Sequence, residues 1–198
     1  MQFGYRIKLL AISKIQDGKV EARVHPTMIP LKNLLTSISG TVNAITMSGD
    51  AVGDILLYGR GAGMMPTASA VVSDIVDIAR NILSGTVRRV PALSYQRESI
   101  RRIPILPIDD LVTHYYFRFA ALDRPGVLST ISGILGKYDI SLQSVHQKGR
   151  KTNGSVPLVM LSHRAKEADV KQALAEIRDL NVVSDEPMLI RIEDDELD

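Results

Sequence analysis

The chain has 198 residues, of which 45% are hydrophobic and 23% are charged, and its formal net charge is +2. It contains no cysteine, which excludes disulfides, thiolate catalysis and cysteine-ligated zinc. No apolar run approaches the ~18 residues of a membrane span, and the N-terminus lacks the layout of a signal peptide. We therefore expect a soluble, cytoplasmic protein of one large or two small domains, with neither nucleic acid nor a membrane as partner.

The first 57 residues predict mostly antiparallel sheet. Gln16-Asp17-Gly18 is the expected turn of a hairpin, because residues 5–13 before it are typical of a strand and residues 19–25 after it alternate between apolar and polar. Pro26 and Pro30 are expected to bracket a loop, and residues 34–39 to form a short helical turn. The expected strands are residues 5–13, 19–25, 42–48 and 52–57.

The fourth of these strands runs into three alternate glycines, Gly59, Gly61 and Gly63, and then into a helix expected to start at Pro66. Glycine permits positive φ and close approach of a ligand, and the free N–H groups of a helix start favour a polar or anionic group. The spacing is not the dinucleotide fingerprint G-x-G-x-x-G, because Met64 stands at the third glycine position. The residues alone are equally compatible with a ligand-binding loop and with a tight structural turn.

The helix from Pro66 is predicted by an apolar stripe with helical period, and Ser84-Gly85 is expected to end it. Residues 86–111 hold three prolines and five arginines without a sustained period. We expect a linker there, with a solvated basic face rather than a nucleic-acid site. The stripe consists of Ala68, Val71, Val72, Ile75, Ile78, Ala79, Ile82 and Leu83.

The second half predicts the order strand, helix, strand, strand, helix, strand, which is the ferredoxin-like βαββαβ unit. The expected fold class of the whole chain is therefore α+β. Tyr115, Phe117 and Phe119 alternate along the first of these strands and are expected on the helix-covered face, which argues against an RNA-binding sheet. The expected elements are strand 113–122, a turn at 123–126 that opens a helix, strands 140–148 and 156–163, helix 166–179 and a last strand with Met188, Ile190 and Ile192.

Asp123 lies at the turn before the first helix of this unit and admits two interpretations. Its carboxylate could bind an α-ammonium group while the amides from Gly126 to Leu128 bind an α-carboxylate. Alternatively, Asp123 only caps the helix, with Pro125 inside the first turn. Without further information the cap is the simpler interpretation.

The run Asp123-Arg124-Pro125-Gly126-Val127-Leu128, followed by Ile140-Ser141 and Gln147, resembles an ACT domain over about residues 112–193. ACT domains sense small molecules in enzymes of amino-acid biosynthesis. The resemblance implies that an amino-acid effector binds at the first strand-helix turn, often where the sheets of two such domains pair. The residues that it assigns to effector binding are Asp123, Gly126, Val127, Leu128, Asp139 and Gln147.

The first half resembles the closing part of the catalytic domain of homoserine dehydrogenases. The resemblance is carried by the segments 4–11, 24–27, 42–45, 49–53 and 58–63 and by Pro66-Thr67-Ala68. It implies NAD(P)-dependent interconversion of L-aspartate 4-semialdehyde and L-homoserine, with threonine as the usual feedback effector in members that carry an ACT domain. The residues that it places beside the nicotinamide and substrate are Gly59, Gly61, Ala62, Gly63 and Thr67.

The resemblance divides the chain into a catalytic-domain part (1–85), a linker (86–111), an ACT domain (112–193) and an acidic, disordered tail (194–198). The family's nucleotide-binding domain and catalytic lysine precede the point that matches Met1, so we expect a C-terminal fragment that is inactive alone and holds no catalytic residue. NAD(P) is expected only in the full-length parent. Self-association is expected through the ACT sheets and the catalytic-domain sheet. The alternative is a free-standing ACT protein that binds an amino acid and dimerises.

Two further expectations concern metals and regulation. The four histidines, His25, His114, His146 and His163, lack ligand spacing, so no metal site is expected. Effector binding near Asp123 is expected to change the pairing of ACT domains, with residues 86–111 transmitting the change to the Gly59 loop.

Overall fold

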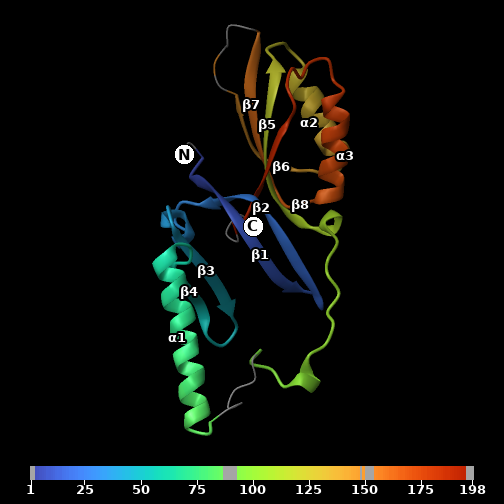
Figure 1. The fold of residues 1–198 in the computed structure, drawn as a ribbon. Helices are drawn as coiled ribbons and strands as arrows, with labels where there is room; N and C mark the ends of the chain where they lie inside the picture. The colour runs from blue at the N-terminus through green and yellow to red at the C-terminus, as the bar shows by residue number, and fades with distance from the viewer. Residues whose placement is uncertain (1–2, 87–92, 148, 150–153, 195–198) are drawn as a thin grey trace. The chain divides into compact units, whose positions relative to one another are not determined.

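The computed structural model describes residues 3–86, 93–147, 149 and 154–194, and these residues form the expected α+β fold (Figure 1). The chain divides into two compact units: Met1–Leu31 together with Ile103–Asp198, and Lys32–Arg102. The ACT-like half thus shares a unit with the first 31 residues, whereas the sequence analysis assigned these residues to another domain. The domain boundaries proposed from the sequence stay predictions. Arg88, Arg89 and the tail from residue 195 lie outside the described residues.

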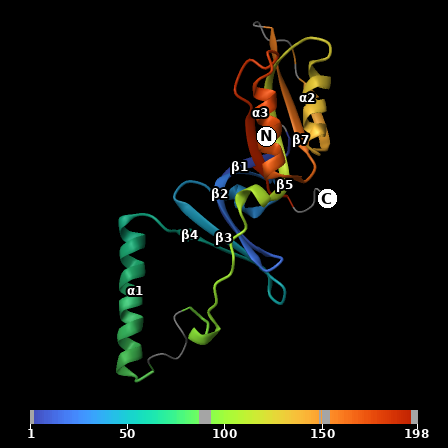
Figure 2. The ribbon, with the colours of Figure 1, turned by 90° about the vertical axis from the view of Figure 1, so that its right-hand side faces the viewer.

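The larger unit is built on a mixed sheet with the strand order β1-β2-β9-β5-β7-β6. Its last four strands and two helices confirm the predicted βαββαβ unit. Figures 1 and 2 show α2 and α3 lying against one face of this sheet. The elements are β5 (Val112–Leu122), α2 (Val127–Lys137), β6 (Leu142–Gln147), β7 (Ser155–Ser162), the two-residue β8 (Ala165–Lys166), α3 (Glu167–Arg178) and β9 (Met188–Ile192).

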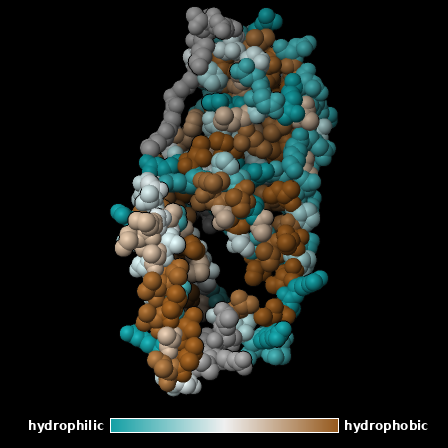
Figure 3. Space-filling view, viewed as in Figure 1, coloured by the Kyte–Doolittle hydropathy of each residue, from teal (hydrophilic) through white to brown (hydrophobic). Residues whose placement is uncertain are grey.

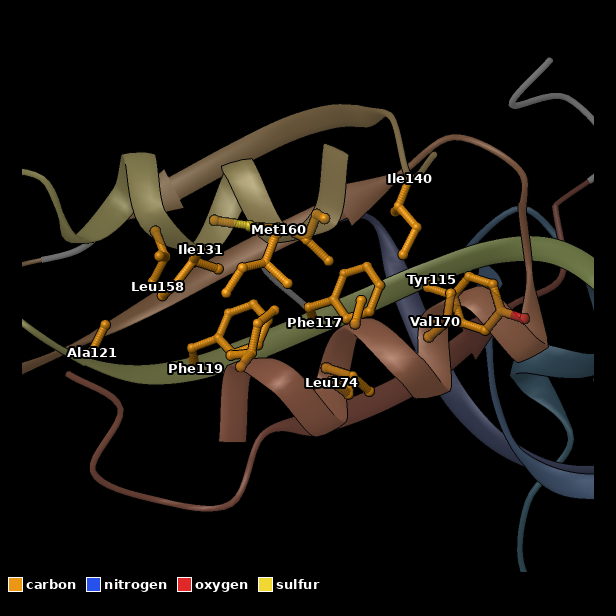
Figure 4. Close-up of a cluster of buried hydrophobic side chains, with 14 of the residues drawn as sticks. Tyr115, Phe117, Phe119, Ala121, Ile131, Ile140, Leu158, Met160, Val170 and Leu174 are labelled. Carbon is orange, nitrogen blue, oxygen red and sulfur yellow. The ribbon is translucent and has the colours of Figure 1, made fainter. Parts of the chain in front are cut away.

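Between the sheet and its two helices lies the hydrophobic core of this unit. Tyr115, Phe117 and Phe119 on β5 are fully buried, and neighbouring rings along this row stack with centroids 6.1 Å apart. Figure 4 shows them pointing between α2 and α3, beside Ile131 and Val170. The predicted core face of β5 is confirmed, and these three aromatic rings are not available for base stacking.

The predicted hairpin is confirmed and is longer than expected, with β1 at Tyr5–Gln16 and β2 at Lys19–Pro30. Positive φ at both Asp17 (50°) and Gly18 (73°) is typical of a two-residue hairpin turn. The expectation that Pro26 and Pro30 bracket a loop is wrong, because both lie in β2 and pair with β1. The second neighbour of β2, β9, pairs only with Thr27 and Met28, so the ladder on that side requires no N–H donor from either proline.

The smaller unit contains a 3₁₀ turn η1 (Leu34–Ser37), strands β3 (Val42–Gly49) and β4 (Gly53–Arg60), and helix α1 (Met64–Leu83). Helix α1 begins two residues before the expected Pro66, with Gly63 as its N-cap. It ends as predicted, where Gly85 adopts a φ of 66°. The linker contains the 3₁₀ turns η2 (Arg97–Ser99) and η3 (Ile108–Asp110).

The apolar stripe of α1 is exposed, although its periodicity predicts a buried face. Ile75, Ile78 and Ile82 are 60%, 58% and 61% exposed, and no residue of the helix is buried. Figure 3 shows the corresponding brown surface along this helix. An amphipathic helix of this kind gains most of its stability by covering its apolar face. None of the helices formed by the described residues is both long and apolar enough to cross a membrane.

Candidate functional site

A cavity of about 380 Å³ lies where β5 ends and α2 begins. Its walls include five of the six residues assigned to the effector by resemblance: Asp123, Gly126, Val127, Leu128 and Gln147. Val127, Val156 and Leu158 are buried and give it an apolar base. Strand β6 contributes Gln147 from the opposite side of the turn, so the site combines residues that are 24 positions apart in sequence.

The turn that forms this cavity depends on the left-handed conformation of Gly126, with φ 91° and ψ −20°. Gly126 is the N-cap of α2, and no side chain caps the helix. The interpretation of Asp123 as the cap, with Pro125 in the first turn, is therefore wrong, because the helix begins at Val127. Gln147 Nε2 instead donates to a carboxylate oxygen of Asp123 over 3.4 Å.

The site presents a carboxylate on one side and helix-start amides on the other. The amide of Val127 donates to the carbonyl of Arg124, and that of Thr130 donates to Gly126. The amides of Leu128 and Ser129 have no backbone acceptor among the residues that the structure describes. An anionic group is stabilised at such a position, and a cationic group is stabilised by the carboxylate of Asp123.

Asp139 is not brought to this cavity. It follows the C-terminal end of α2, where its φ is 58° and its amide donates to the carbonyl of Gly136 over 3.1 Å. Its position is that of a helix-ending residue. The cavity wall does include Arg124, a cation that the sequence analysis did not assign. The signal that could have found it is its place inside the quoted run at residues 123–128.

In the glycine-rich loop of residues 59–63, the local structure explains why two positions are glycine. A Cβ on Gly61 would stand 2.3 Å from Nδ2 of Asn43, so a side chain there would have to displace β3 or Asn43. Gly63 has φ 125° and ψ 151°, a conformation nearly exclusive to glycine. Gly59 has open space around its Cβ position. The structural-turn interpretation thus holds for Gly61 and Gly63.

The remaining residues that resemblance places at the coenzyme lie on the same loop and helix start. The amide of Thr67 donates to the carbonyl of Gly63 over 3.0 Å, and Pro66 has no N–H. The amides of Met64 and Met65 lie in the first turn of α1, where a helix provides no acceptor for them. Ala62 stands between the two glycines that fix the loop.

The histidines lie apart, on three different strands and after a fourth. His114 is buried and its Nδ1 donates to the carbonyl of Ser162 over 3.2 Å, while the ring of His146 lies edge-on to Phe3. Within the described ranges, no three His, Asp or Glu residues form a group that could hold a metal ion.

The sheet order, the two helices on one face and the cavity at the first strand-helix turn define an ACT domain. Residues 115–182 match the ACT domain family profile. Residues 1–76 match the homoserine dehydrogenase family profile. The chain thus carries a segment that matches the homoserine dehydrogenase family, followed by an ACT domain.

The relatives support this assignment over nearly the whole chain. It is 42% identical to a homoserine dehydrogenase of Pseudomonas aeruginosa over 96% of this chain and 44% of that protein. It is 41% identical to one of Neisseria gonorrhoeae, over 97% of this chain and 44% of that protein. A crystal structure of a homoserine dehydrogenase from Thiobacillus denitrificans superposes with a TM-score of 0.86 at 43% identity, covering 98% of this chain and 43% of that chain. The chain thus spans less than half the length of the relatives it matches.

Proposed function

We propose that this chain works as part of an NAD(P)-dependent homoserine dehydrogenase, which interconverts L-aspartate 4-semialdehyde and L-homoserine. In this proposal the ACT domain is the sensor for feedback inhibition, and threonine is its effector. Residues 59–63 with Thr67 form the part of the active site that lies beside the nicotinamide and the substrate. The observation that carries the proposal is the family match over both halves of the chain.

The chemistry of the cavity supports an α-amino acid as effector. An amino acid has an ammonium group and a carboxylate on one carbon, and the cavity places Asp123 near the amides that start α2. The apolar base formed by Val127, Val156 and Leu158 suits a small side chain. A neutral or doubly anionic ligand would leave one of the two polar sides unmatched.

The first experiment titrates the chain with threonine by calorimetry, with lysine, serine, methionine and homoserine as controls. Threonine at ~100 times its dissociation constant is expected to raise the free energy of unfolding by about 2.7 kcal/mol. Selective binding of threonine supports the effector assignment. Selective binding of another amino acid contradicts threonine but keeps the sensor, and binding of none contradicts a working sensor in this chain.

The catalytic proposal has a separate test. Hydride transfer needs a held nicotinamide, a substrate clamp and a positioned acid or base. The 198 residues contain no G-x-G-x-x-G fingerprint. We expect no oxidation of homoserine by the purified chain, and measurable turnover would overturn this expectation.

Self-association is part of the same proposal. The exposed apolar stripe of α1 is a surface that a stable protein covers, either with a second copy or with further polypeptide. In the full-length enzyme we propose pairing of ACT sheets as the event that effector binding changes. Light scattering with and without effector measures this directly.

A further inference from the structure

The β1–β2 hairpin is joined to the ACT sheet by very few backbone hydrogen bonds. Strand β2 pairs with β9 at two register positions only, Thr27 with Arg191 and Met28 with Ile192. One more backbone bond runs from the Glu193 amide to the Met28 carbonyl, over 2.9 Å. By contrast, β5 pairs with β7 over seven positions. The attachment of the hairpin therefore depends largely on side chains.

The side chains at this junction include an apolar cluster, in which Met28 packs with Leu161 and Ile192, and a group of charged side chains. The hairpin is turned so that much of its polar face is covered. On β2, Glu21, Arg23 and Thr27 are buried, whereas Val24 on the other face is 70% exposed. Arg23 is the centre of the junction. Its Nε donates to Glu21 over 2.6 Å, its Nη2 forms an ion pair with Glu193 beyond the end of β9, and Lys14 on β1 also pairs with Glu193.

The third contact of Arg23 is with His25, and it determines the state of the imidazole ring. Nη1 of Arg23 lies 3.0 Å from Nε2 of His25. A guanidinium can only donate, so Nε2 must be the acceptor and must carry no proton. The ring proton is then on Nδ1, which lies 3.0 Å from the carbonyl oxygen of Pro26 and 3.0 Å from the Thr27 hydroxyl. Protonation of Nε2 would place an N–H donor and a positive charge next to the guanidinium of Arg23, so the hydrogen bond would be lost and the two cations would repel each other.

Further charges face His25 from the neighbouring elements. Arg191 on β9 donates to Glu167 at the start of α3, with its Nε 2.8 Å from the carboxylate, and the Tyr115 hydroxyl on β5 donates to the same carboxylate over 2.8 Å. Both Arg191 and Glu167 act on His25 electrostatically. The charged and titratable groups around the ring or its ion pairs are Lys14 on β1, Glu21 and Arg23 on β2, Tyr115 on β5, Glu167 on α3, and Arg191 and Glu193 on and after β9.

We propose that this junction is a proton-sensitive latch: protonation of His25 at Nε2, followed at lower pH by protonation of Glu193, releases the β1–β2 hairpin from β9 while the ACT core stays folded. The core is expected to stay folded because most of its side chains are apolar, as for Phe117, Phe119 and Ile131, and its buried carboxylate, Glu167, accepts from both Arg191 and Tyr115. Release is expected because the contacts of Arg23 depend on a neutral imidazole and an ionised carboxylate. Once they are lost, the hairpin is held to β9 only by the small apolar cluster around Met28 and by few backbone bonds.

The pKa shifts of His25 and Glu193 have the direction that the proposed latch requires. Burial lowers the pKa of His25 below its ordinary value, and the nearby Arg191 and Arg23 lower it further, against the raising effects of the Pro26 carbonyl and Glu167. The docked state thus favours the neutral ring, so this contribution is complete above the ordinary histidine pKa and is lost as the pH falls from that value through the lowered pKa of the docked ring. Burial raises the pKa of Glu193, but Lys14 and Arg23 outweigh it and the pKa is lowered. That second contribution is lost only at more acidic pH.

The test measures the distance between hairpin and ACT core as a function of pH. The chain has no native cysteine, so Ala22→Cys on β2 and Ala175→Cys on α3, both at exposed positions, give a clean pair of sites for nitroxide labels. Double electron–electron resonance on the full chain, diluted with unlabelled protein, measures the distance between the two labels. At about pH 8 it should give a single population of distances. A second, broader population should grow below about pH 6.5 while far-UV circular dichroism keeps the ACT core signal.

Variants separate the latch from general acid unfolding. His25→Gln keeps an acceptor for Arg23 but cannot be protonated, and it should move the onset of release at least about one pH unit lower. Glu193→Gln should populate the released state already at about pH 8. His163→Gln, an exposed histidine after β7, is the matched control and should leave the profile unchanged. The latch is refuted if the distances do not change with pH, if His25→Gln follows the parent profile, or if the ACT core unfolds together with release.

Discussion

At the scale of single residues, position relative to a helix end decides which acidic side chain can bind a ligand. Asp123 and Asp139 were both assigned to the effector, yet they lie before and after α2. The 11 residues of this helix span about 16 Å, so the two carboxylates cannot meet in one small cavity. Asp123 lies at the positive end of the helix dipole and in the wall of the cavity.

Substituting Asp123→Asn should weaken threonine binding about tenfold, or ~1.4 kcal/mol, because the ammonium loses a charged partner. Calorimetry on the 198-residue chain measures this. Asp139→Asn is the matched control, since asparagine also tolerates the left-handed conformation found there. Equal losses for the two variants would contradict the placement of the effector at the start of α2. In a full-length enzyme, Asp123→Ala should relieve inhibition and leave uninhibited turnover near normal.

Gly63→Ala should destabilise the Lys32–Arg102 unit by about 1–3 kcal/mol, because alanine is strained at a φ of 125°. Urea unfolding followed by circular dichroism of the α1 signal measures the change. Gly59→Ala has open space at its Cβ and is the comparison, with an expected effect within about 0.5 kcal/mol. If Gly63→Ala left the free energy of unfolding unchanged, the backbone at this position would have to relax without cost, which would contradict the prediction.

At the scale of elements, periodicity predicts which face of a helix is apolar but not what covers it. The stripes of α1, α2 and α3 were all predicted, and those of α2 and α3 pack onto the sheet. The stripe of α1 is exposed over its whole length. The hairpin shows the opposite case, since its charged face is covered and Val24 and Leu9 are exposed.

We predict that Ile75→Lys lowers the oligomeric state of the chain, measured by light scattering, without a large loss of its own stability. The reason is that Ile75 is 60% exposed and contributes little buried area within one copy. Asp74→Lys on the same helix, outside the apolar stripe, should leave association unchanged. Loss of association in both variants would assign the effect to charge rather than to the apolar face.

At the scale of the whole molecule, the two compact units differ in how they are stabilised. The larger unit has a continuous core of aromatic and aliphatic side chains between its sheet and two helices. The smaller unit has a two-stranded sheet and a 20-residue helix with no buried residue. Such a helix opens locally far more often than a strand that crosses a packed core.

Hydrogen exchange should therefore resolve two levels of protection. We expect the amides of β5 and β7 to exchange at the rate of global unfolding, and those of α1 to exchange orders of magnitude faster in dilute monomeric protein. Raising the protein concentration should slow exchange in α1 if a second copy covers its stripe. Protection of α1 equal to that of β5 at every concentration would contradict the division into a stable and a labile unit.

Most of the fold could be predicted from local pattern. The position of the hairpin turn, the helices of the ACT domain and the buried row Tyr115, Phe117 and Phe119 were all predicted, because each depends on residues close in sequence. Pro26 was misplaced because a strand tolerates proline only when its neighbours do not need a donor, and neighbours in a sheet are set by distant residues.

The candidate site also has features that local sequence predicts and features that only long-range contacts determine. The sequence alone determined the run at residues 123–128, the glycines of the 59–63 loop and the order of elements around them, since backbone conformation and amphipathic period are local properties. Only the tertiary structure decided that Gln147 lies across from Asp123, that Asp139 does not, and that Arg23 and Glu193 meet in a partly buried ion pair. These contacts join residues up to 170 positions apart, and a chain brings such residues together only when its strands pair and its apolar faces pack.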